Sequence, residues 1–181
     1  IAPLINDRTR ALLINSPANP AGSILSRAEL ATLAELPIPL VSDEIYHGLT
    51  YEGEEHSLLE FTDEAFVLGG FSKAYAMTGW RVGWLIGPND IVKACTNFQS
   101  HVTSNVANVA QRAALAAVSG DLSAVDAMRG EQAGHGRRRG HQIGERVAPT
   151  VEDVAAPGAH AQRRGRHPSD LRGAFGAVGY V

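Results

Sequence analysis

Short apolar runs alternate with polar turns along the first half of the chain. Each run ends at residues such as Gly, Pro, Asn or Ser, and this pattern is typical of buried strands. Strands are expected at Arg10–Ser16, Ile38–Tyr46, Ala65–Ser72 and Trp80–Gly87.

Helical patterns lie between and after these runs. Ser26, followed three residues later by Glu29, is a capping-box signature, and Pro37 ends the helix that begins there. Strands that alternate with helices predict an α/β fold, in which a mostly parallel sheet carries helices on both faces. Helices are expected at Leu30–Leu36, Asp90–Val102 and Asn105–Gly120.

The texture of the sequence changes near Arg129. Residues 1–120 have the patterns of a packed domain, whereas residues 121–181 begin as a helical connector and become dense in Arg, Gly, Ala and His. Three interpretations of this tail stay open: a disordered basic segment, a short helix followed by irregular structure, and a segment read out of frame from a GC-rich gene. We favour the last, and we assign no secondary structure to the tail.

Composition narrows the classes of function. The formal net charge is −3, so the chain carries no overall signature of nucleic-acid binding. The single cysteine, Cys95, fits a reducing compartment and predicts a cytoplasmic protein. No run approaches the roughly 18 apolar residues of a membrane helix. His47, His56 and His101 lack the spacing of a metal site and are expected in loops or at the surface.

Polar residues follow three of the expected strands, and ligands gather at the carboxyl ends of strands in open α/β sheets. In the loop Asn15–Gly22, two prolines and a glycine can hold Asn19 as a hydrogen-bond donor; an ordinary tight turn is the alternative. After the next strand, a partly buried Asp43 needs a cationic or hydrogen-bonding partner. Tyr46 can present its hydroxyl to the same pocket. The alternative is a carboxylate that only caps a backbone amide.

The third polar group surrounds Lys73, one of two lysines in the chain. In an apolar pocket a lysine amine loses its proton more readily, and such amines form Schiff bases with carbonyl compounds. Arg81, after the break at Gly79, offers a planar fork that suits a phosphate, and Ser72 can add a hydroxyl. The alternative is a surface lysine near a structural arginine.

Together these groups meet the needs of one cofactor, pyridoxal 5′-phosphate (PLP). The amine suits the aldehyde, the carboxylate suits the ring nitrogen, the phenol and amide suit the ring oxygen, and the guanidinium suits the phosphate. A ring whose nitrogen stays protonated is an electron sink for the carbanion that forms when an amino acid loses its α-proton.

Residues 1–120 resemble the large domain of class I and II aminotransferases of PLP fold type I. The resemblance lies in the joint spacing of SPANPAG, SDEIYHGLTYEG and GFSKAYAMTGWRVGW. It implies transfer of an amino group between an amino acid and a 2-oxo acid by way of a Schiff base on Lys73. It further implies that Asp43 pairs with the pyridine nitrogen, that Asn19 and Tyr46 bind the ring oxygen, and that Arg81 and Ser72 bind the phosphate.

The resemblance also implies parts that these motifs do not supply. Family members have a phosphate-binding loop, an aromatic ring that stacks on the cofactor, and an arginine that clamps the substrate carboxylate. We therefore expect a fragment of the large domain with little activity by itself, and a homodimer for the intact enzyme.

Two other interpretations of the function remain. One is a different fold type I enzyme, such as a carbon–sulfur lyase or an aminocyclopropanecarboxylate synthase, which would use the same lysine, aspartate and arginine. The other is a truncated remnant without catalytic activity. The motif AMTGWRVGW favours an aminotransferase over the first of these.

Overall fold

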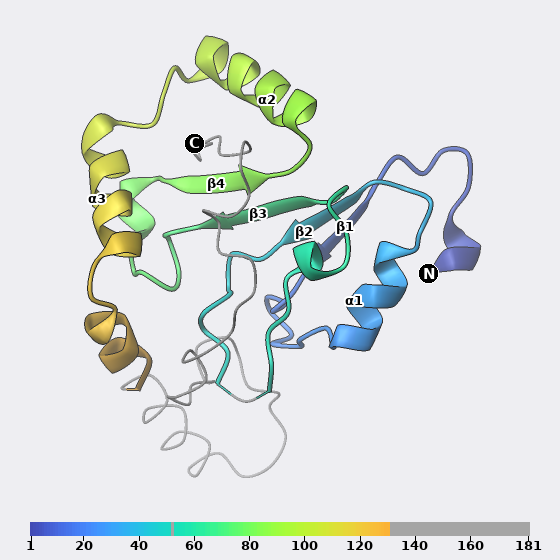
Figure 1. The fold of residues 1–181 in the computed structure, drawn as a ribbon, viewed down its shortest axis with the longest axis horizontal. Helices are drawn as coiled ribbons and strands as arrows, with labels where there is room; N and C mark the ends of the chain where they lie inside the picture. Colours follow the sequence, from blue (N-terminus) through green and yellow to red (C-terminus); the bar gives the residue numbers. More distant parts are fainter. Residues whose placement is uncertain (52, 131–181) are drawn as a thin grey trace.

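A four-stranded sheet forms the centre of the structure, a computed structural model that describes residues 1–51 and 53–130 (Figure 1). The prediction for the tail beyond residue 130 lies outside the described residues. All four predicted strands are confirmed, and each is shorter at both ends than its apolar run. They are β1 (Leu12–Asn15), β2 (Leu40–Asp43), β3 (Phe66–Gly70) and β4 (Gly83–Ile86).

The sheet has the order β1-β2-β3-β4 and is mostly parallel. The β1–β2 and β2–β3 pairs are parallel, whereas β3 and β4 are antiparallel. Parallel neighbours need a long crossover connection, whereas antiparallel neighbours do not. The segment between β3 and β4 holds one turn of 3₁₀ helix, η3 (Thr78–Trp80), and is too short for a crossover.

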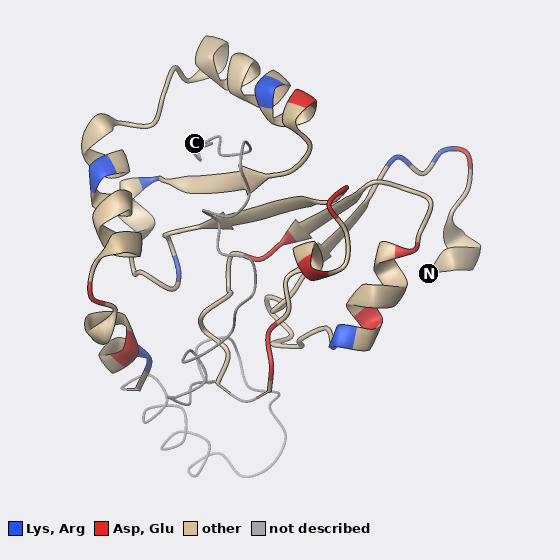
Figure 2. Ribbon diagram, in the orientation of Figure 1, with Lys and Arg blue, Asp and Glu red and all other residues tan. Residues whose placement is uncertain are grey.

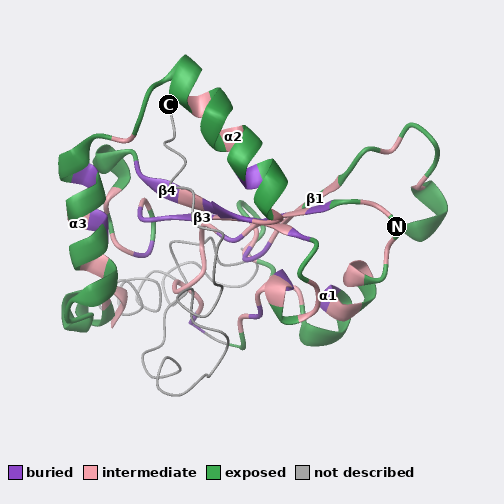
Figure 3. Cartoon of the chain, turned by 45° about the horizontal axis from the view of Figure 1, so that its top comes forward, coloured by how far each residue is buried: buried purple, intermediate pink, exposed green. Residues whose placement is uncertain are grey.

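Three α-helices flank the sheet, and residues 123–130 are also helical. The capping box at the start of α1 is confirmed, because the Ser26 hydroxyl accepts from the Glu29 N–H while the Glu29 carboxylate accepts from the Ser26 N–H at 2.8 Å. Figures 1 and 3 show α1 and α2 on opposite sides of the sheet, with α3 beside one end of β4. The helices are α1 (Arg27–Ala34), α2 (Asn89–Val102) and α3 (Asn108–Ser119), with shorter 3₁₀ turns η1 (Ala2–Leu4) and η2 (Leu58–Glu60).

Two clusters of buried apolar side chains form the core. The first joins α1 and η2 to the sheet, and Leu30 and Leu58 are its most buried members. The second joins α3 to the residues that flank the β3–β4 connection. The indole of Trp84 packs against both clusters. Figure 3 shows that burial is concentrated on the strands, while large parts of α2 and α3 are exposed.

Charged residues are distributed over helices, strand ends and loops rather than gathered on one face (Figure 2). This distribution agrees with the small formal net charge of −3. Within residues 1–51 and 53–130, no helix has the length and apolar character needed to cross a membrane.

We expect Leu30→Ala to lower the free energy of unfolding by about 2–5 kcal/mol, because it leaves a cavity in the first cluster. Leu13→Ala is the matched control: Leu13 is 67% exposed, whereas Leu30 is 1% exposed. We expect the control to change stability by less than about 0.5 kcal/mol. Urea denaturation of both variants measures the difference, and equal losses would contradict the assignment of the core.

Tyr75 predicts a loss of stability at alkaline pH. Burial raises the pKa of its hydroxyl above the ordinary value, and the Arg129 guanidinium offsets part of this rise. The folded-state pKa exceeds the unfolded one. The contribution of Tyr75 to the free energy of unfolding is therefore complete below the unfolded pKa of about 10, and it is lost as pH rises through the folded pKa. We expect Tyr75→Phe to flatten the decline of unfolding free energy above about pH 10. An unchanged slope would contradict this.

Candidate active site

The carboxyl ends of β1, β2 and β3 meet at one edge of the sheet. Asn15 pairs with Asp43, and Asp43 pairs with Leu68 one strand further along. Because β4 is antiparallel, its amino end lies at the same edge, where Gly83 pairs with Gly70. This edge therefore collects the loops that carry all six candidate residues: Asn19, Asp43, Tyr46, Ser72, Lys73 and Arg81.

Three candidate residues from three separate loops come together. The Asn19 side-chain amide donates a hydrogen bond of 2.7 Å to the Tyr46 hydroxyl. The Lys73 Nζ lies 5.7 Å from the centroid of the Tyr46 ring. This distance is within the range of a cation–π contact. Tyr46 is thus the meeting point of the amide and the amine.

Asp43 lies at the end of β2 and is half-buried, as the sequence predicts. Its Oδ1 accepts a hydrogen bond of 3.1 Å from the Ile45 N–H, which is the capping contact of the alternative interpretation. Its second carboxylate oxygen has no hydrogen bond with the described residues. One oxygen therefore anchors the local turn, and the other is free to accept a hydrogen bond from a ligand.

Ser72 and Arg81 are linked through Thr78. The Thr78 hydroxyl donates to the main-chain oxygen of Ser72 at 2.7 Å, and Arg81 Nη1 donates to the main-chain oxygen of Thr78 at 3.1 Å. Arg81 has a left-handed backbone conformation, with φ of 52°. Among the described residues, the other guanidinium N–H groups of Arg81 and the Ser72 hydroxyl have no hydrogen-bond partner.

Lys73 differs from the sequence prediction in its burial. The sequence predicts an amine in an apolar pocket, but in the described structure Lys73 is exposed. The apolar neighbours face inward instead: Phe71 and Ala74 are each 7% exposed. The prediction of a buried amine is therefore wrong for the described residues, because the loop buries the side chains around the lysine and turns the lysine outward.

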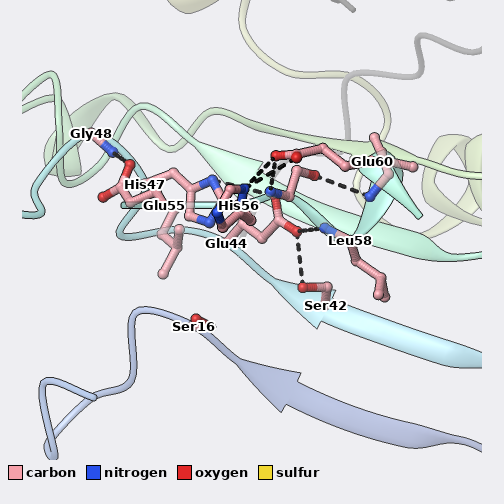
Figure 4. Close-up of polar contacts among 12 residues, drawn as sticks. Ser16, Ser42, Glu44, His47, Gly48, Glu55, His56, Leu58 and Glu60 are labelled. Carbon is pink, nitrogen blue, oxygen red and sulfur yellow. Dashed lines mark hydrogen bonds and ion pairs between the residues drawn. The ribbon is translucent and has the colours of Figure 1, made fainter. Parts of the chain in front are cut away.

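A buried carboxylate beside the site has a purely structural set of contacts (Figure 4). Glu44 Oε1 accepts hydrogen bonds of 3.0 Å from the Ser42 hydroxyl and 3.0 Å from the Leu58 N–H. Glu44 Oε2 lies 3.4 Å from Nδ1 of His47. Glu44 thus ties the end of β2 to η2.

His56 lies in a loop, as predicted, but it is buried rather than at the surface. It is 6% exposed, and its ring nitrogens lie 3.1 Å from Glu60 and 3.6 Å from Glu54 (Figure 4). The Glu60 carboxylate is a hydrogen-bond partner for Nδ1 of the buried ring, and the Glu54 carboxylate lies near Nε2. Among residues 1–51 and 53–130, no group of three or more His, Cys, Asp or Glu side chains could hold a metal ion.

Sequence reasoning missed two residues that organise the site. Asn15 contacts the main chains of Asp43 and Asn19, and Thr78 contacts Ser72 and Arg81. The available signal for Asn15 is a polar residue that ends an apolar strand directly before a proline-rich loop. For Thr78 the signal is its place beside the Gly79 break.

The chain is similar to characterised aminotransferases. A family model described as "Aminotransferase class I and II" matches residues 1–141. The aspartate aminotransferase of Streptomyces avermitilis is 45% identical over 184 residues, which cover 91% of this chain and 45% of that protein. Because 91% of 181 residues exceeds 130, this match reaches into the tail. The aspartate aminotransferase of Geobacillus stearothermophilus is 46% identical over 69% of this chain and 34% of that protein.

The fold is similar as well. The crystal structure of the aspartate aminotransferase of Thermotoga maritima matches 82% of this chain and 42% of its own, with a TM-score of 0.72 and 37% sequence identity. The chain spans less than half the length of these three relatives. The family match covers more than half of the chain, and the fold is that of the same family. The chain therefore belongs to the class I and II aminotransferases.

Proposed function

We propose that this chain carries the lysine-bearing part of the active site of a PLP-dependent aminotransferase. The observation that carries the proposal is the meeting of Asn19, Tyr46 and Lys73, with 2.7 Å between the amide and phenol and 5.7 Å between the amine and the phenol ring. When bound, the cofactor supplies an electron sink for the α-carbon of an amino acid.

The polar groups at this edge fit that cofactor. Lys73 offers a primary amine for its aldehyde, and the free oxygen of Asp43 offers an acceptor for its protonated ring nitrogen. The Asn19 amide and Tyr46 hydroxyl lie 2.7 Å apart, so they can hydrogen-bond one shared ring oxygen. Arg81 and Ser72, both joined to Thr78, have donors left for a phosphate.

The six residues then divide between four tasks. Arg81 and Ser72 hold the phosphate, and Asp43 keeps the ring nitrogen protonated by stabilising its positive charge. Asn19 and Tyr46 orient the ring. Lys73 would hold the cofactor through its exposed amine, and its Nζ would carry a proton to or from the α-carbon of the substrate.

The proposed substrates are an amino acid and a 2-oxo acid. The relatives from Streptomyces avermitilis and Geobacillus stearothermophilus are named aspartate aminotransferases, which supports aspartate as the amino donor. The proposal includes a homodimer for the intact enzyme, a cytoplasmic location, and no nucleic-acid or membrane partner. These three points rest on the family resemblance, on the single cysteine Cys95 and on the net charge of −3.

The lysine assignment is tested by borohydride reduction of the protein mixed with PLP. We expect mass spectrometry to find one reduced cofactor on Lys73, and we expect Lys73→Ala to lose it. Lys93 in α2 is the other lysine of the chain, so Lys93→Arg is the matched control and should keep the label. A label on Lys93 or only on the amino terminus would overturn the proposal.

Amino transfer is measured in the complete enzyme as formation of oxaloacetate from aspartate in the presence of a 2-oxo acid. We expect Lys73→Ala to abolish this reaction and Lys93→Arg to retain it. Wild-type enzyme that releases other products from aspartate, without aminating the 2-oxo acid, would favour a lyase instead.

The phosphate contact of Arg81 predicts a selective loss of affinity. We expect Arg81→Gly to weaken binding of PLP by about 10- to 100-fold, the effect of a lost charged hydrogen bond. Gly tolerates the left-handed backbone at this position, so the substitution removes the side chain without strain. Pyridoxal, which lacks the phosphate, should lose little affinity.

Arg112→Ala is the matched control for Arg81→Gly. Arg112 is an exposed arginine of α3 whose guanidinium contacts Asn108 on the same helix. Equal weakening of both ligands by Arg81→Gly, or equal effects of the two substitutions, would contradict a phosphate contact. Absorbance titration with each ligand measures the dissociation constants.

A further inference from the structure

One side-chain amide joins the loop that carries Asn19 to the end of β2, where Asp43 lies. Asn15 is the last residue of β1 and pairs with Asp43, the last residue of β2. Its Nδ2 donates a hydrogen bond of 3.0 Å to the main-chain oxygen of Asp43. Its Oδ1 accepts a hydrogen bond of 2.9 Å from the main-chain N–H of Asn19. The donor and the acceptor of one amide therefore bond to two different segments, the end of β2 and the loop of Asn19.

This arrangement requires both halves of an amide. The Asp43 carbonyl can only accept a hydrogen bond, and the Asn19 N–H can only donate one, so a single orientation of the Asn15 side chain satisfies both. A carboxylate at this position would keep the bond to Asn19 and oppose the Asp43 carbonyl. An alanine would lose both bonds.

Asn15 contacts Asn19, which in turn contacts Tyr46. The Asn19 side chain that donates to Tyr46 belongs to the residue whose N–H Asn15 holds. The Asp43 carbonyl has a second donor, the Ser16 N–H at 3.2 Å, whereas the Asn19 N–H donates only to Asn15 among the described residues. Loss of the Asn15 side chain should therefore release Asn19 more than Asp43.

We propose that Asn15 is a positioning residue that holds Asn19 in place to hydrogen-bond the ring oxygen of the cofactor. This inference rests on the proposed function for the identity of the ligand. The positioning of Asn19 itself is a property of the cofactor-free chain and can be tested without any ligand.

The first test measures amide hydrogen exchange in the cofactor-free protein. We expect Asn15→Ala to speed exchange of the Asn19 N–H by about two- to tenfold, the effect of one lost hydrogen bond. Asn15→Asp retains the acceptor and should leave this rate near that of the wild type. The Ala18 N–H, bonded to the Ser23 main-chain oxygen at 2.9 Å, is an internal reference in the same loop.

Asn6→Ala is the matched control. The Asn6 amide also uses both halves, donating to the Leu4 oxygen at 3.3 Å and accepting from the Arg8 N–H at 3.0 Å, but within an exposed turn. It should leave Asn19 unchanged. Unchanged exchange at Asn19 in Asn15→Ala, or equal acceleration at Ala18, would overturn the proposal, since the second result means that the whole loop loosens.

The second test follows the visible absorbance of the bound cofactor as a function of pH. A hydrogen-bond donor to the ring oxygen favours the deprotonated form of the bound cofactor. Loss of that donor therefore raises the pKa at which the absorbance of the cofactor changes. We expect Asn15→Ala to raise it by less than Asn19→Ala does, and the double variant to match Asn19→Ala alone, because the two residues act through one contact. Additive shifts would contradict the proposal.

The two tests separate the two claims. If wild-type protein binds no PLP, the proposed function fails, and the exchange experiment still decides whether Asn15 positions Asn19. If the wild type binds PLP and Asn15→Ala changes neither exchange nor the absorbance transition, the proposed function stands and the positioning role is wrong.

Discussion

The site depends on the alignment of four strand ends at one edge of the sheet. Three parallel strands bring their carboxyl ends there, and the antiparallel β4 adds its amino end, so that the residues before it join the same group. Adjacent residues of a strand face opposite sides, and a slip of one residue would exchange them. Such a slip in β2 would put Glu44 where Asp43 now lies.

The two neighbouring carboxylates Asp43 and Glu44 have different surroundings, and this difference separates their roles. Glu44 is 8% exposed, and its oxygens are occupied by Ser42, Leu58 and His47. A buried carboxylate is stable only when it is satisfied in this way. Asp43 is half-buried and keeps one oxygen without a partner among the described residues. The site therefore gains a free acceptor because its neighbour carries the structural contacts.

Local signals in the sequence predict most of the strands and helices. They do not predict the direction of each strand or which loop side chains become buried. The apolar runs and the Ser26 capping box gave four strands and the start of α1 at the right places. The antiparallel direction of β4 does not follow from the sequence, because a short apolar run does not indicate whether a strand runs parallel or antiparallel to its neighbour. The burial of His56 depends on carboxylates that only the folded loop brings to it. The outward turn of Lys73 likewise depends on which neighbours reach the core.

An exposed amine can act at a defined place only if its neighbours hold the loop, and an aromatic row does so here. Trp84 of β4 meets Phe71 edge-on at 5.1 Å between ring centroids, and Phe71 lies 5.2 Å from Tyr75. Phe71 and Tyr75 stand on either side of Lys73 in the sequence. Trp84 has room because of Gly69, where a Cβ would lie 2.5 Å from the indole. Gly69 therefore makes space for the Trp84 indole, which anchors the loop of Lys73. The role of this glycine is packing rather than flexibility.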